Sequence, residues 1–307
     1  MRALVTGGAG FIGSNLVDAL LERGDEVAVI DDMSTGRREN LAQADGAAVS
    51  ELDIRDFQAV SDVVGRTKPE VVFHLAAQID VRKSVADPAF DASINVHGTI
   101  NLLRAALDAG VERFVNTSTG GAIYGENEII PAPESHPAAP MAGYGQSKLS
   151  AEGYVGLFER LHGLSTVSLR YGNVYGPRQD PLGEAGVIAI FCGLAVGGGN
   201  PTVYGDGLQT RDYVYVGDVV AANLKAAESG VGGPINIGCE VETTVLDLVE
   251  LLRPHAKGEF QPQHEPKRTG EVQRSTLDCS RAREELGWEA EVSLAQGIER
   301  TLASISG

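Results

Sequence analysis

The stretch that decides the fold lies near the amino terminus and reads Thr6-Gly7-Gly8-Ala9-Gly10-Phe11-Ile12-Gly13. The apolar run at residues 2–5 predicts a buried strand before it. Residues 14–24 after it have apolar side chains at helical spacing and end in a glycine. A strand, a glycine turn and a helix in this order are typical of a dinucleotide-binding motif, in which the N–H groups at the helix start face the phosphates.

Each glycine of the turn has its own predicted task. Gly7 supplies the positive φ of a tight turn, Gly10 has no side chain to keep a pyrophosphate away, and Gly13 lets the helix pack closely on its strand. The spacing is G-x-x-G-x-x-G and not G-x-G-x-x-G. A glycine pattern alone also occurs in ordinary turns, so the flanking strand and helix carry the prediction.

Composition limits the classes of protein that fit. The 307 residues suffice for one large domain or two lobes. A net charge of −17 argues against sequence-independent binding to nucleic acid or to an anionic membrane. Cys192, Cys239 and Cys279 are far apart and show neither a disulfide framework nor a metal-ligand spacing. With no signal-peptide pattern and no apolar run long enough to span a bilayer, we expect a cytoplasmic protein without a metal.

Strands alternate with helices along the chain. Short apolar runs predict strands at residues 27–30, 47–52, 71–77, 113–118 and 165–170, and helical periodicity predicts helices at 56–64, 90–109 and 144–161. This alternation predicts an α/β fold with a doubly wound parallel sheet of the Rossmann type.

The character of the chain changes after residue 170. Residues 172–207 are rich in glycine and proline around a short helix at 187–196, and the apolar run at 213–216 indicates a return to the main sheet. We therefore predict an NAD-binding Rossmann domain from residues 1–172 and about 208–238. A smaller, mixed α/β lobe that binds the substrate is predicted from about 173–207 and 239–307.

Asp31 ends the second predicted strand, about 20 residues past the glycines, where an acid suits the ribose hydroxyls of adenosine. A carboxylate would repel the 2′-phosphate of NADP, so Asp31 favours NAD. Arg37 and Arg38 lie just beyond and could pair with that phosphate, and Asp31 could simply be a turn residue at a strand end. His74, on another predicted strand, is expected to be a satisfied core residue and not a catalyst.

Tyr144 and Lys148 give the most specific catalytic pattern. Positions i and i+4 share one face of a helix, so both side chains would point into the same cleft. A tyrosine with its ordinary pKa near 10 is a poor base at neutral pH. A nearby ammonium and the positive charge of a nicotinamide would lower that pKa. A bare Tyr-x-x-x-Lys pair also occurs on solvated helices, so the glycine turn is needed for this interpretation.

Together these segments resemble the extended short-chain dehydrogenase/reductase family, and within it the nucleotide-sugar epimerases typified by UDP-galactose 4-epimerase. The resemblance covers essentially the whole chain. It is carried by residues 6–13, 31–36, 53–54, 75–78, 95, 118–125, 144–148, 170–178, 209–218 and 268–271.

The resemblance implies a reaction at C4 of a UDP-hexose. Tyr144 would take the proton of the sugar 4-hydroxyl while hydride passes to tightly held NAD, and hydride would return to the other face of the rotated 4-keto sugar. Lys148 would bond the nicotinamide ribose. The implied NAD contacts are Gly7, Gly10, Phe11, Ile12, Gly13, Asp31, Asp32, Met33, Ser34, Thr35, Gly36, Asp53, Ile54, Leu75, Ala76, Ala77, Gln78, Asn95, Thr117, Tyr144, Lys148, Tyr171 and Val174.

The same resemblance implies a nucleotide-sugar pocket. Arg211 and Arg268 would hold the diphosphate, and Glu271 would accept from the uridine ribose. Arg178 is expected only to brace its loop. The implied substrate contacts are Ser118, Tyr144, Asn173, Val187, Thr202, Val203, Tyr204, Arg211, Arg268 and Glu271.

One departure from the family concerns the catalytic hydroxyl. The usual serine or threonine lies four residues before the tyrosine of the Tyr-Gly pair, and that position is Gly120. Ser118, Thr119 or a water must serve instead. We prefer Ser118 slightly, because Thr119 is expected to turn towards the nicotinamide.

The segment Gly120-Gly121-Ala122 also separates related reactions. Sugar 4,6-dehydratases carry Thr-Asp-Glu there, and nucleotide-sugar decarboxylases tend to carry a glutamate. This chain has no acid in that segment, which leaves oxidation and re-reduction at C4.

Several alternatives stay open. Ser275 aligns with a position that limits sugar size, so an N-acetylated sugar is expected to fit. The helices at residues 93–109 and 144–161 form a bundle between two subunits in the family, which implies a homodimer. The hexose could instead be UDP-glucuronate or UDP-N-acetylglucosamine, and an NAD(P)-dependent nucleotide-sugar reductase is a further possibility. A non-catalytic NAD-binding protein would keep the glycine turn and lose the Tyr144/Lys148 pair.

Overall fold

The computed structural model describes residues 1–126, 129–181, 186–267 and 272–306. Its centre is a seven-stranded sheet in which every neighbouring pair is parallel, with the order β11-β6-β5-β4-β1-β2-β3. This order confirms the predicted doubly wound sheet. The strands are β1 (Arg2–Thr6), β2 (Glu26–Asp31), β3 (Ala48–Glu51), β4 (Val71–His74), β5 (Arg113–Thr119), β6 (Ser165–Tyr171) and β11 (Pro234–Ile237).

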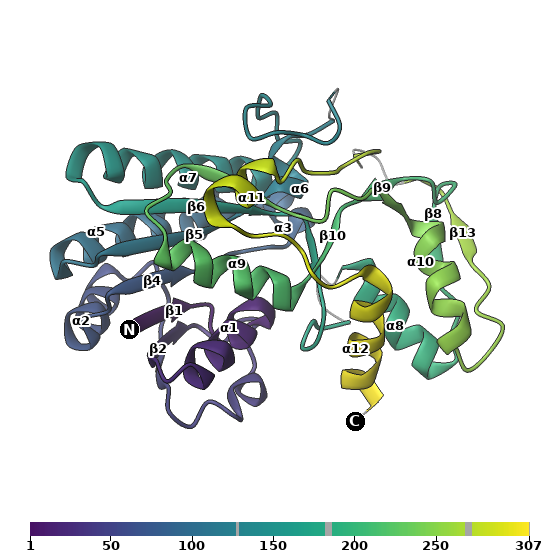
Figure 1. The fold of residues 1–307 in the computed structure, drawn as a ribbon, viewed down its shortest axis with the longest axis horizontal. Helices are drawn as coiled ribbons and strands as arrows, with labels where there is room; N and C mark the ends of the chain where they lie inside the picture. The colour runs from purple at the N-terminus through teal and green to yellow at the C-terminus, as the bar shows by residue number, and fades with distance from the viewer. Residues whose placement is uncertain (127–128, 182–185, 268–271, 307) are drawn as a thin grey trace.

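Helices cover both faces of this sheet (Figure 1). One face packs on α1 (Phe11–Glu22) and α9 (Val216–Glu228), and the other packs on α2 (Phe57–Thr67), α5 (Thr99–Ala109) and α7 (Gly143–His162). Alternate residues of a strand serve opposite faces: Val5 lies in the first cluster and Leu4 in the second. Because both faces are buried there, β1, β2 and β4 consist largely of apolar residues, whereas β3 at the edge is mostly exposed.

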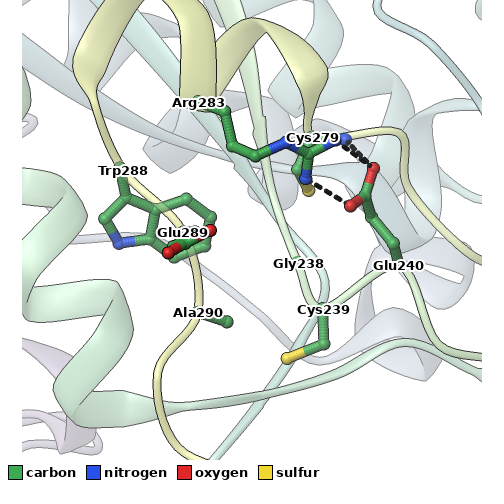
Figure 2. A pocket seen from close by; sticks show the side chains of 8 residues that line it. All are labelled: Gly238, Cys239, Glu240, Cys279, Arg283, Trp288, Glu289 and Ala290. Carbon is green, nitrogen blue, oxygen red and sulfur yellow. Dashed lines mark hydrogen bonds and ion pairs between the residues drawn. The ribbon is translucent and has the colours of Figure 1, made fainter.

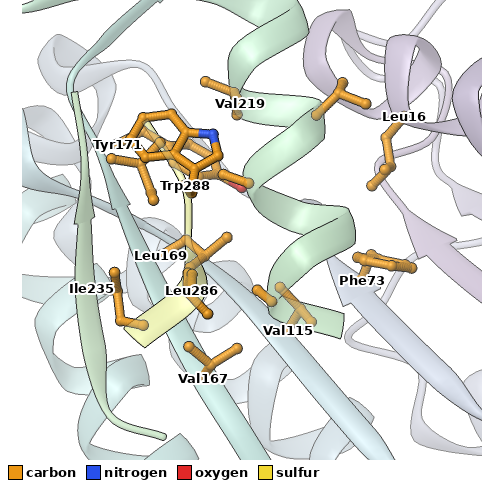
Figure 3. Close-up of a cluster of buried hydrophobic side chains, with 14 of the residues drawn as sticks. Leu16, Phe73, Val115, Val167, Leu169, Tyr171, Val219, Ile235, Leu286 and Trp288 are labelled. Atoms are coloured by element: carbon orange, nitrogen blue, oxygen red, sulfur yellow. The ribbon is translucent and has the colours of Figure 1, made fainter. Parts of the chain in front are cut away.

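The first of these clusters also receives a side chain from the C-terminal part of the chain. Figure 3 shows Trp288 there, together with residues of β6, α9 and α1. The indole Nε1 of Trp288 donates to Asp218 O at 2.9 Å, which ties the segment after α11 (Ser280–Leu286) to α9. The segment after α11 thus completes the core of the main sheet.

The helix predicted over residues 90–109 is continuous in the structure, but its middle turn is π-helical. The structure has α4 (Pro88–Ala92), a π-helical turn η2 (Ser93–Gly98) and then α5, and it places a further short helix α3 (Val81–Ala86) before them. A Cβ on Gly98 would lie 2.5 Å from Ile54 Cδ1, so the turn lies close against the segment after β3. π-helical turns often occur at functional sites, and this one carries Asn95.

The expectation that residues 213–216 return to the main sheet is wrong. There β10 (Tyr213–Tyr215) pairs in parallel with β7 (Asn173–Tyr175) in a separate two-stranded sheet. The free edge of β6 is taken by β11, which pairs with it from Ser168 to Tyr171. Two more small sheets join β9 (Thr210–Arg211) to β12 (Thr243–Thr244) and β8 (Thr202–Tyr204) to β13 (Gln263–Glu265).

A third apolar cluster lies beyond the end of the sheet. It is built from α8 (Val187–Gly197), α10 (Val245–Leu252) and α12 (Leu294–Ser306), which stand together at the right of Figure 1. Phe191, Leu248 and Ile298 are at its centre and are fully buried. The division into two lobes near residues 172 and 238 stays a prediction. The short helical segments are η1 (Arg38–Leu41), α6 (Gly120–Ile123) and η3 (Arg253–His255). None of the helices in the described ranges is long and apolar enough to cross a membrane.

Candidate active site

The glycine turn has the geometry that a diphosphate needs. Gly7 has φ +70°, and a Cβ placed on it would lie 2.7 Å from Ala76 N, so the turn lies directly against the end of β4. A Cβ on Gly13 would collide with Gly7 O. The close contact of Gly13 is therefore with the glycine turn, whereas the sequence had suggested a contact with the strand. Gly10 caps α1 without a side-chain hydrogen bond, and the start of the helix is left open to an anion.

Asp31 ties the end of β2 to this turn. Its Oδ2 accepts from Ala9 N and its Oδ1 from Met33 N, both at 2.9 Å. A Cβ on Gly36 would lie 2.6 Å from Asp31 Oδ1, so only glycine fits beside the carboxylate. The acid is therefore fixed at the carboxyl end of β2, where the ribose of a bound dinucleotide is expected.

The two arginines that left the choice of cofactor open are both paired. Arg37 Nη2 lies 2.6 Å from Asp180 Oδ2, and Arg38 Nη2 lies 2.5 Å from Glu51 Oε2. A 2′-phosphate would have to displace a carboxylate from one of them. The site therefore fits NAD better than NADP.

Tyr144 stands at the start of α7, near the Thr119 side chain at the end of β5. Burial and the negative charge of Asp91 raise the pKa of Tyr144 to about 12, and the interaction with the Thr119 hydroxyl lowers it only in part. The chain alone, with Lys148 one helical turn away, therefore does not lower this pKa. Lowering it falls to the positive charge of a bound nicotinamide.

Lys148 lies one turn further along α7 and is buried, with 4% of its surface exposed. Its Nζ donates to Thr117 O at 2.9 Å, one residue before Ser118 on β5. Burial lowers the pKa of Lys148 to about 8, against the opposing effect of Glu152 and Asp91. The ammonium is thus held at the carboxyl end of the sheet, beside the tyrosine on the same face of α7.

A group of buried amides and a carboxylate stands behind this pair. Asn95 Oδ1 accepts from Gln78 N at 2.8 Å, and Asn95 Nδ2 bonds Gln78 O at 2.9 Å, Ser147 Oγ at 3.0 Å and Asp91 Oδ1 at 3.2 Å. Gln78 Nε2 donates to the same Asp91 oxygen at 2.7 Å. The polar atoms of Asn95 are therefore engaged by the chain, although we predicted this residue as a cofactor contact. Asp91 is not among the residues predicted from the sequence, where its only signal is its place one helical turn before Asn95.

His74 connects the glycine turn to the π-helical turn, and it is buried with both ring nitrogens bonded, as expected for a core residue. Thr99 Oγ1 donates to Asn95 O at 2.7 Å, so it accepts from His74 Nε2 at 2.8 Å. We assign the proton to Nε2, which leaves Nδ1 to accept from Thr6 Oγ1 at 2.8 Å. Burial lowers the pKa of His74 to about 3, which keeps the ring neutral.

The geometry favours Thr119 over Ser118 as the catalytic hydroxyl. The two residues point to opposite faces of β5 because successive side chains alternate along a strand. Ser118 is buried, and no described residue hydrogen-bonds its Oγ. Thr119 is half-buried, and its hydroxyl acts on the pKa of Tyr144. Our preference for Ser118 is therefore not supported.

The neighbouring glycines of α6 face different ways. A Cβ on Gly120 would lie 2.5 Å from Leu277 Cδ1, which is fully buried, so this position points into the core. A Cβ on Gly121 would lie 3.4 Å from Asn173 Oδ1 and 4.0 Å from Thr119 Oγ1. Gly121 thus faces the site, and its lack of a side chain leaves the space beside Thr119 free of any acid. In the sequence, counting four residues back from Tyr124 gives Gly120 as the family's hydroxyl position, and Gly120 does not face the site.

The predicted sugar contacts lie on the small sheets. Asn173 begins β7, and its amide oxygen points towards Gly121. Thr202 and Tyr204 on β8 are half-buried, whereas Val203 between them is fully buried in the third cluster, so its side chain does not reach a ligand. Arg211 lies on β9, and its Nη1 donates to Thr210 O at 2.7 Å.

The other predicted residues are placed as follows. Arg268 and Glu271 lie outside the described residues. Arg178 forms an ion pair with Asp18 of α1, in keeping with a bracing role. Tyr171 OH bonds Thr117 and Asn223 in the interior. The remaining residues lie at strand ends, at helix starts or in adjoining loops: Phe11, Ile12, Asp32, Ser34, Thr35, Asp53, Ile54, Leu75, Ala76, Ala77, Val174 and Val187.

A cavity of about 150 Å³ lies elsewhere, next to Cys239, Cys279 and Trp288 (Figure 2). An ion pair between Arg283 and Glu240 lies at one side of it. None of the predicted cofactor or substrate residues lines it, and burial raises the pKa of the Cys239 thiol to about 12, which makes it unreactive. We therefore locate the reaction at Tyr144 and not in this cavity.

Comparison with protein families places this geometry in a known group. The model of the NAD dependent epimerase/dehydratase family matches residues 3–238, which is most of the chain. The chain is 45% identical over 306 residues to a UDP-glucose 4-epimerase of Mycolicibacterium smegmatis, and this match spans 98% of the chain and 97% of that protein.

Solved structures give the same result. The fold is similar to that of a UDP-glucose 4-epimerase from Thermotoga maritima with UDP-glucose, with a TM-score of 0.96, 46% identity and coverage of 100% of this chain and 99% of that one. It is also similar to a Thermus thermophilus UDP-glucose 4-epimerase in complex with NAD, with a TM-score of 0.94, 43% identity and coverage of 100% and 99%.

Proposed function

Because this chain belongs to the NAD-dependent epimerase/dehydratase family, we propose that it is a UDP-glucose 4-epimerase, which interconverts UDP-glucose and UDP-galactose. The relatives with 43–46% identity over nearly their full length support this activity. The protein depends on NAD, as its family does.

The observation that carries the proposal is that the hydroxyl of Thr119 lies near Tyr144 and beside an acid-free Gly121. A hydroxyl and a tyrosine that lie close together can jointly hold the oxygen on a sugar carbon. Expulsion of water or loss of carbon dioxide would call for an additional group near C5 or C6. A side chain at position 121 would enter this space, and glycine supplies none.

NAD fits the residues present, because the glycine turn leaves the start of α1 open and Asp31 stands at the end of β2. When bound, NAD accepts a hydride from C4 of the sugar and returns it. Tyr144 takes the proton of the 4-hydroxyl as the hydride leaves and gives a proton back to the 4-keto oxygen on the return. Thr119 donates to that oxygen, and Lys148 bonds the nicotinamide ribose and stabilises the phenolate.

Substrate recognition is assigned to the other side of the site. We propose that Asn173 bonds the sugar or its phosphate, that Arg211 and Arg268 hold the diphosphate, and that Thr202 and Tyr204 flank the uracil. Glu271 would accept from the uridine ribose. The position of Asn173 beside Gly121 supports its part in this assignment.

The first test is a conversion without added cofactor. Purified protein incubated with UDP-galactose alone is expected to yield UDP-glucose, because NAD is regenerated in every cycle and stays bound. A reductase would need NAD(P)H in an amount equal to its product. No UDP-glucose from protein that carries NAD would rule out the proposed activity.

The substrate range follows from Ser275, which is small and buried. Its segment runs beside β9, since Thr210 N donates to Gln273 O at 2.9 Å, and it continues to Leu277 under Gly120. We propose that the N-acetylated pair is also epimerised. Steady-state rates on UDP-N-acetylglucosamine and UDP-glucose test this, and complete inactivity on the N-acetylated sugar would contradict it.

We also propose a homodimer formed through α5 and α7. Tyr154 and Leu161 of α7 are exposed by 39% and 65%, which supports a partner for that helix. Gel filtration with light scattering at low micromolar concentration is expected to give the mass of a dimer. A monomer under these conditions would contradict the assignment.

A further inference from the structure

Asp91 on α4 is a buried carboxylate that the reaction as described so far does not use. Only 1% of its surface is exposed. Its Oδ1 accepts from Gln78 Nε2 at 2.7 Å and from Asn95 Nδ2 at 3.2 Å. Its Oδ2 is buried and accepts no hydrogen bond from any described residue. A buried carboxylate is costly unless a cation compensates it, so its presence calls for an explanation.

Hydrogen bonds lead from Asp91 to the catalytic helix. Asn95 Nδ2 also contacts Ser147 Oγ at 3.0 Å, and Ser147 Oγ donates to Tyr144 O at 3.0 Å. Ser147 stands between Tyr144 and Lys148 in the first turns of α7. The carboxylate therefore acts, through Asn95, on the backbone that carries the tyrosine.

The charges near Lys148 single out Asp91. Glu152 is engaged by Arg170, whose Nε and Nη2 lie 2.9 and 2.7 Å from its two oxygens. That ion pair compensates the charge of Glu152. Asp91 is the other carboxylate that acts on Lys148.

The remaining titratable groups on the neighbouring elements contribute little charge. His74 on β4 is neutral, because burial lowers its pKa to about 3. Tyr171 on β6 is neutral as well, because burial raises its pKa to about 12. Arg82 and Lys83 on α3 and His97 in η2 are exposed to solvent, which screens them.

We propose that Asp91 is a positioning residue for the Tyr144/Lys148 pair: through Gln78 and Asn95 it fixes the first turn of α7, and its charge compensates the buried ammonium of Lys148. The inference rests on the proposed function. Its electrostatic part has a clear sign. The carboxylate raises the pKa of both Tyr144 and Lys148, so its removal lowers both.

The test is an ultraviolet difference titration of the Tyr144 phenolate in the NAD-loaded protein, with Tyr144→Phe as the blank. Asp91→Asn keeps the size and one acceptor oxygen and removes the charge. We expect the ionisation midpoint of Tyr144 to fall by about one pH unit. Both limbs of the kcat profile are expected to move to lower pH, and kcat at neutral pH to fall several-fold.

Asp87→Asn is the matched control. Asp87 caps α4 one turn earlier, where its Oδ1 accepts from Phe90 N at 2.9 Å, and asparagine caps a helix equally well. This variant also loses one negative charge, but an exposed one, so the Tyr144 midpoint and kcat are expected to stay at the wild-type values. A second variant, Gln78→Leu, breaks a bond to Asp91 without changing the charge. It is expected to lower kcat and to leave the midpoint in place.

Two results would overturn the proposal: a wild-type midpoint in Asp91→Asn, or an equal shift in Asp87→Asn. If Asp91→Asn does not fold as judged by bound NAD and circular dichroism, Gln78→Leu and Ser147→Ala carry the test. Wild-type kcat in both would then overturn it. The titration needs no substrate, so a failure to epimerise UDP sugars would reject the proposed function while leaving the role of Asp91 separately measurable.

Discussion

The part of the site around Tyr144 and the part around Asn173 lie on either side of Thr119, and different interactions hold each part in place. The Tyr144 side stands on the main sheet and is fixed by side-chain hydrogen bonds between elements, through Asn95, Ser147 and His74. The Asn173 side stands on sheets of two short strands, which are held by backbone pairing and by the Asp212 carboxylate, an acceptor for the N–H groups of Cys239, Glu240 and Leu277.

This difference matches two different demands: catalysis needs precisely placed groups, whereas substrate recognition tolerates small adjustments. Proton and hydride transfer tolerate little displacement, so a rigid hydrogen-bonded network suits the Tyr144 side. Sugar and nucleotide recognition is spread over several contacts, each worth less. Changes on the Tyr144 side should therefore act on kcat, and changes on the Asn173 side on KM.

The largest effect is expected from Tyr144→Phe. The variant loses the proton-transfer group but keeps the ring in its place, so kcat should fall about 1,000-fold while NAD stays bound. Conversion of UDP-galactose and the NAD content of the purified variant are the measurements. A fully active variant would show that the Tyr144 side does not carry the chemistry.

The second test compares the two adjacent hydroxyls. Thr119→Val keeps the shape and removes the partner of Tyr144, so kcat should fall about 100-fold. Ser118→Ala removes a buried hydroxyl that no described residue bonds, so its kcat should equal that of the wild type. Steady-state rates decide between them, and the reverse ranking would restore Ser118 as the catalytic hydroxyl.

A smaller effect is expected from a change on the Asn173 side of the site. Asn173→Ala removes the proposed hydrogen bond between this side chain and the substrate, so KM for UDP-glucose should rise about tenfold with kcat nearly unchanged. Initial rates over a range of substrate concentration separate the two parameters. A fall in kcat without a change in KM would place Asn173 with the catalytic group and remove the distinction between the sides.

The smallest and sharpest test uses the neighbouring glycines. Gly120→Ala pushes a methyl group against Leu277 and should cost about 1–3 kcal/mol of stability without changing KM. Gly121→Ala meets only ordinary contacts and should leave Tm unchanged while raising KM a few-fold.

Thermal unfolding and initial rates measure both variants. Leu277→Ala combined with Gly120→Ala should cost less stability than the sum of the two single changes, because the smaller side chain makes room for the methyl group. If both single variants shift Tm and neither shifts KM, Gly121 does not face the substrate.

The sequence predicted the features that depend on nearby residues. The turn at Gly7 needs a positive φ, the strand before it is continuously apolar, and Tyr144 and Lys148 are one helical turn apart. Each of these constraints acts within a few residues, so pattern and spacing are enough to find it.

Features that depend on distant contacts were missed. Periodicity does not reveal the π-helical turn at Asn95, which goes with the bonds to Gln78 and the packing of Gly98 on Ile54. Both β10 and β11 are short apolar runs, and only tertiary pairing decides which one joins β6. Counting back from Tyr124 assumed a fixed loop length and placed the family's hydroxyl position at Gly120, so the choice among Ser118, Thr119 and a water stayed open.

The strand order has a consequence for synthesis on the ribosome. β1 lies inside the main sheet, and each later strand joins an edge that is already made: β2 on β1, β3 on β2, β4 on β1, then β5, β6 and β11 in turn. In the small sheets the first strand is synthesised well before its partner: β7 pairs with the later β10, β9 with β12 and β8 with β13. The nascent chain can thus assemble the cofactor-binding side from its amino terminus onward. The proposed pocket for the sugar nucleotide cannot be completed before β13 (Gln263–Glu265), near the carboxyl end of the chain, has been synthesised.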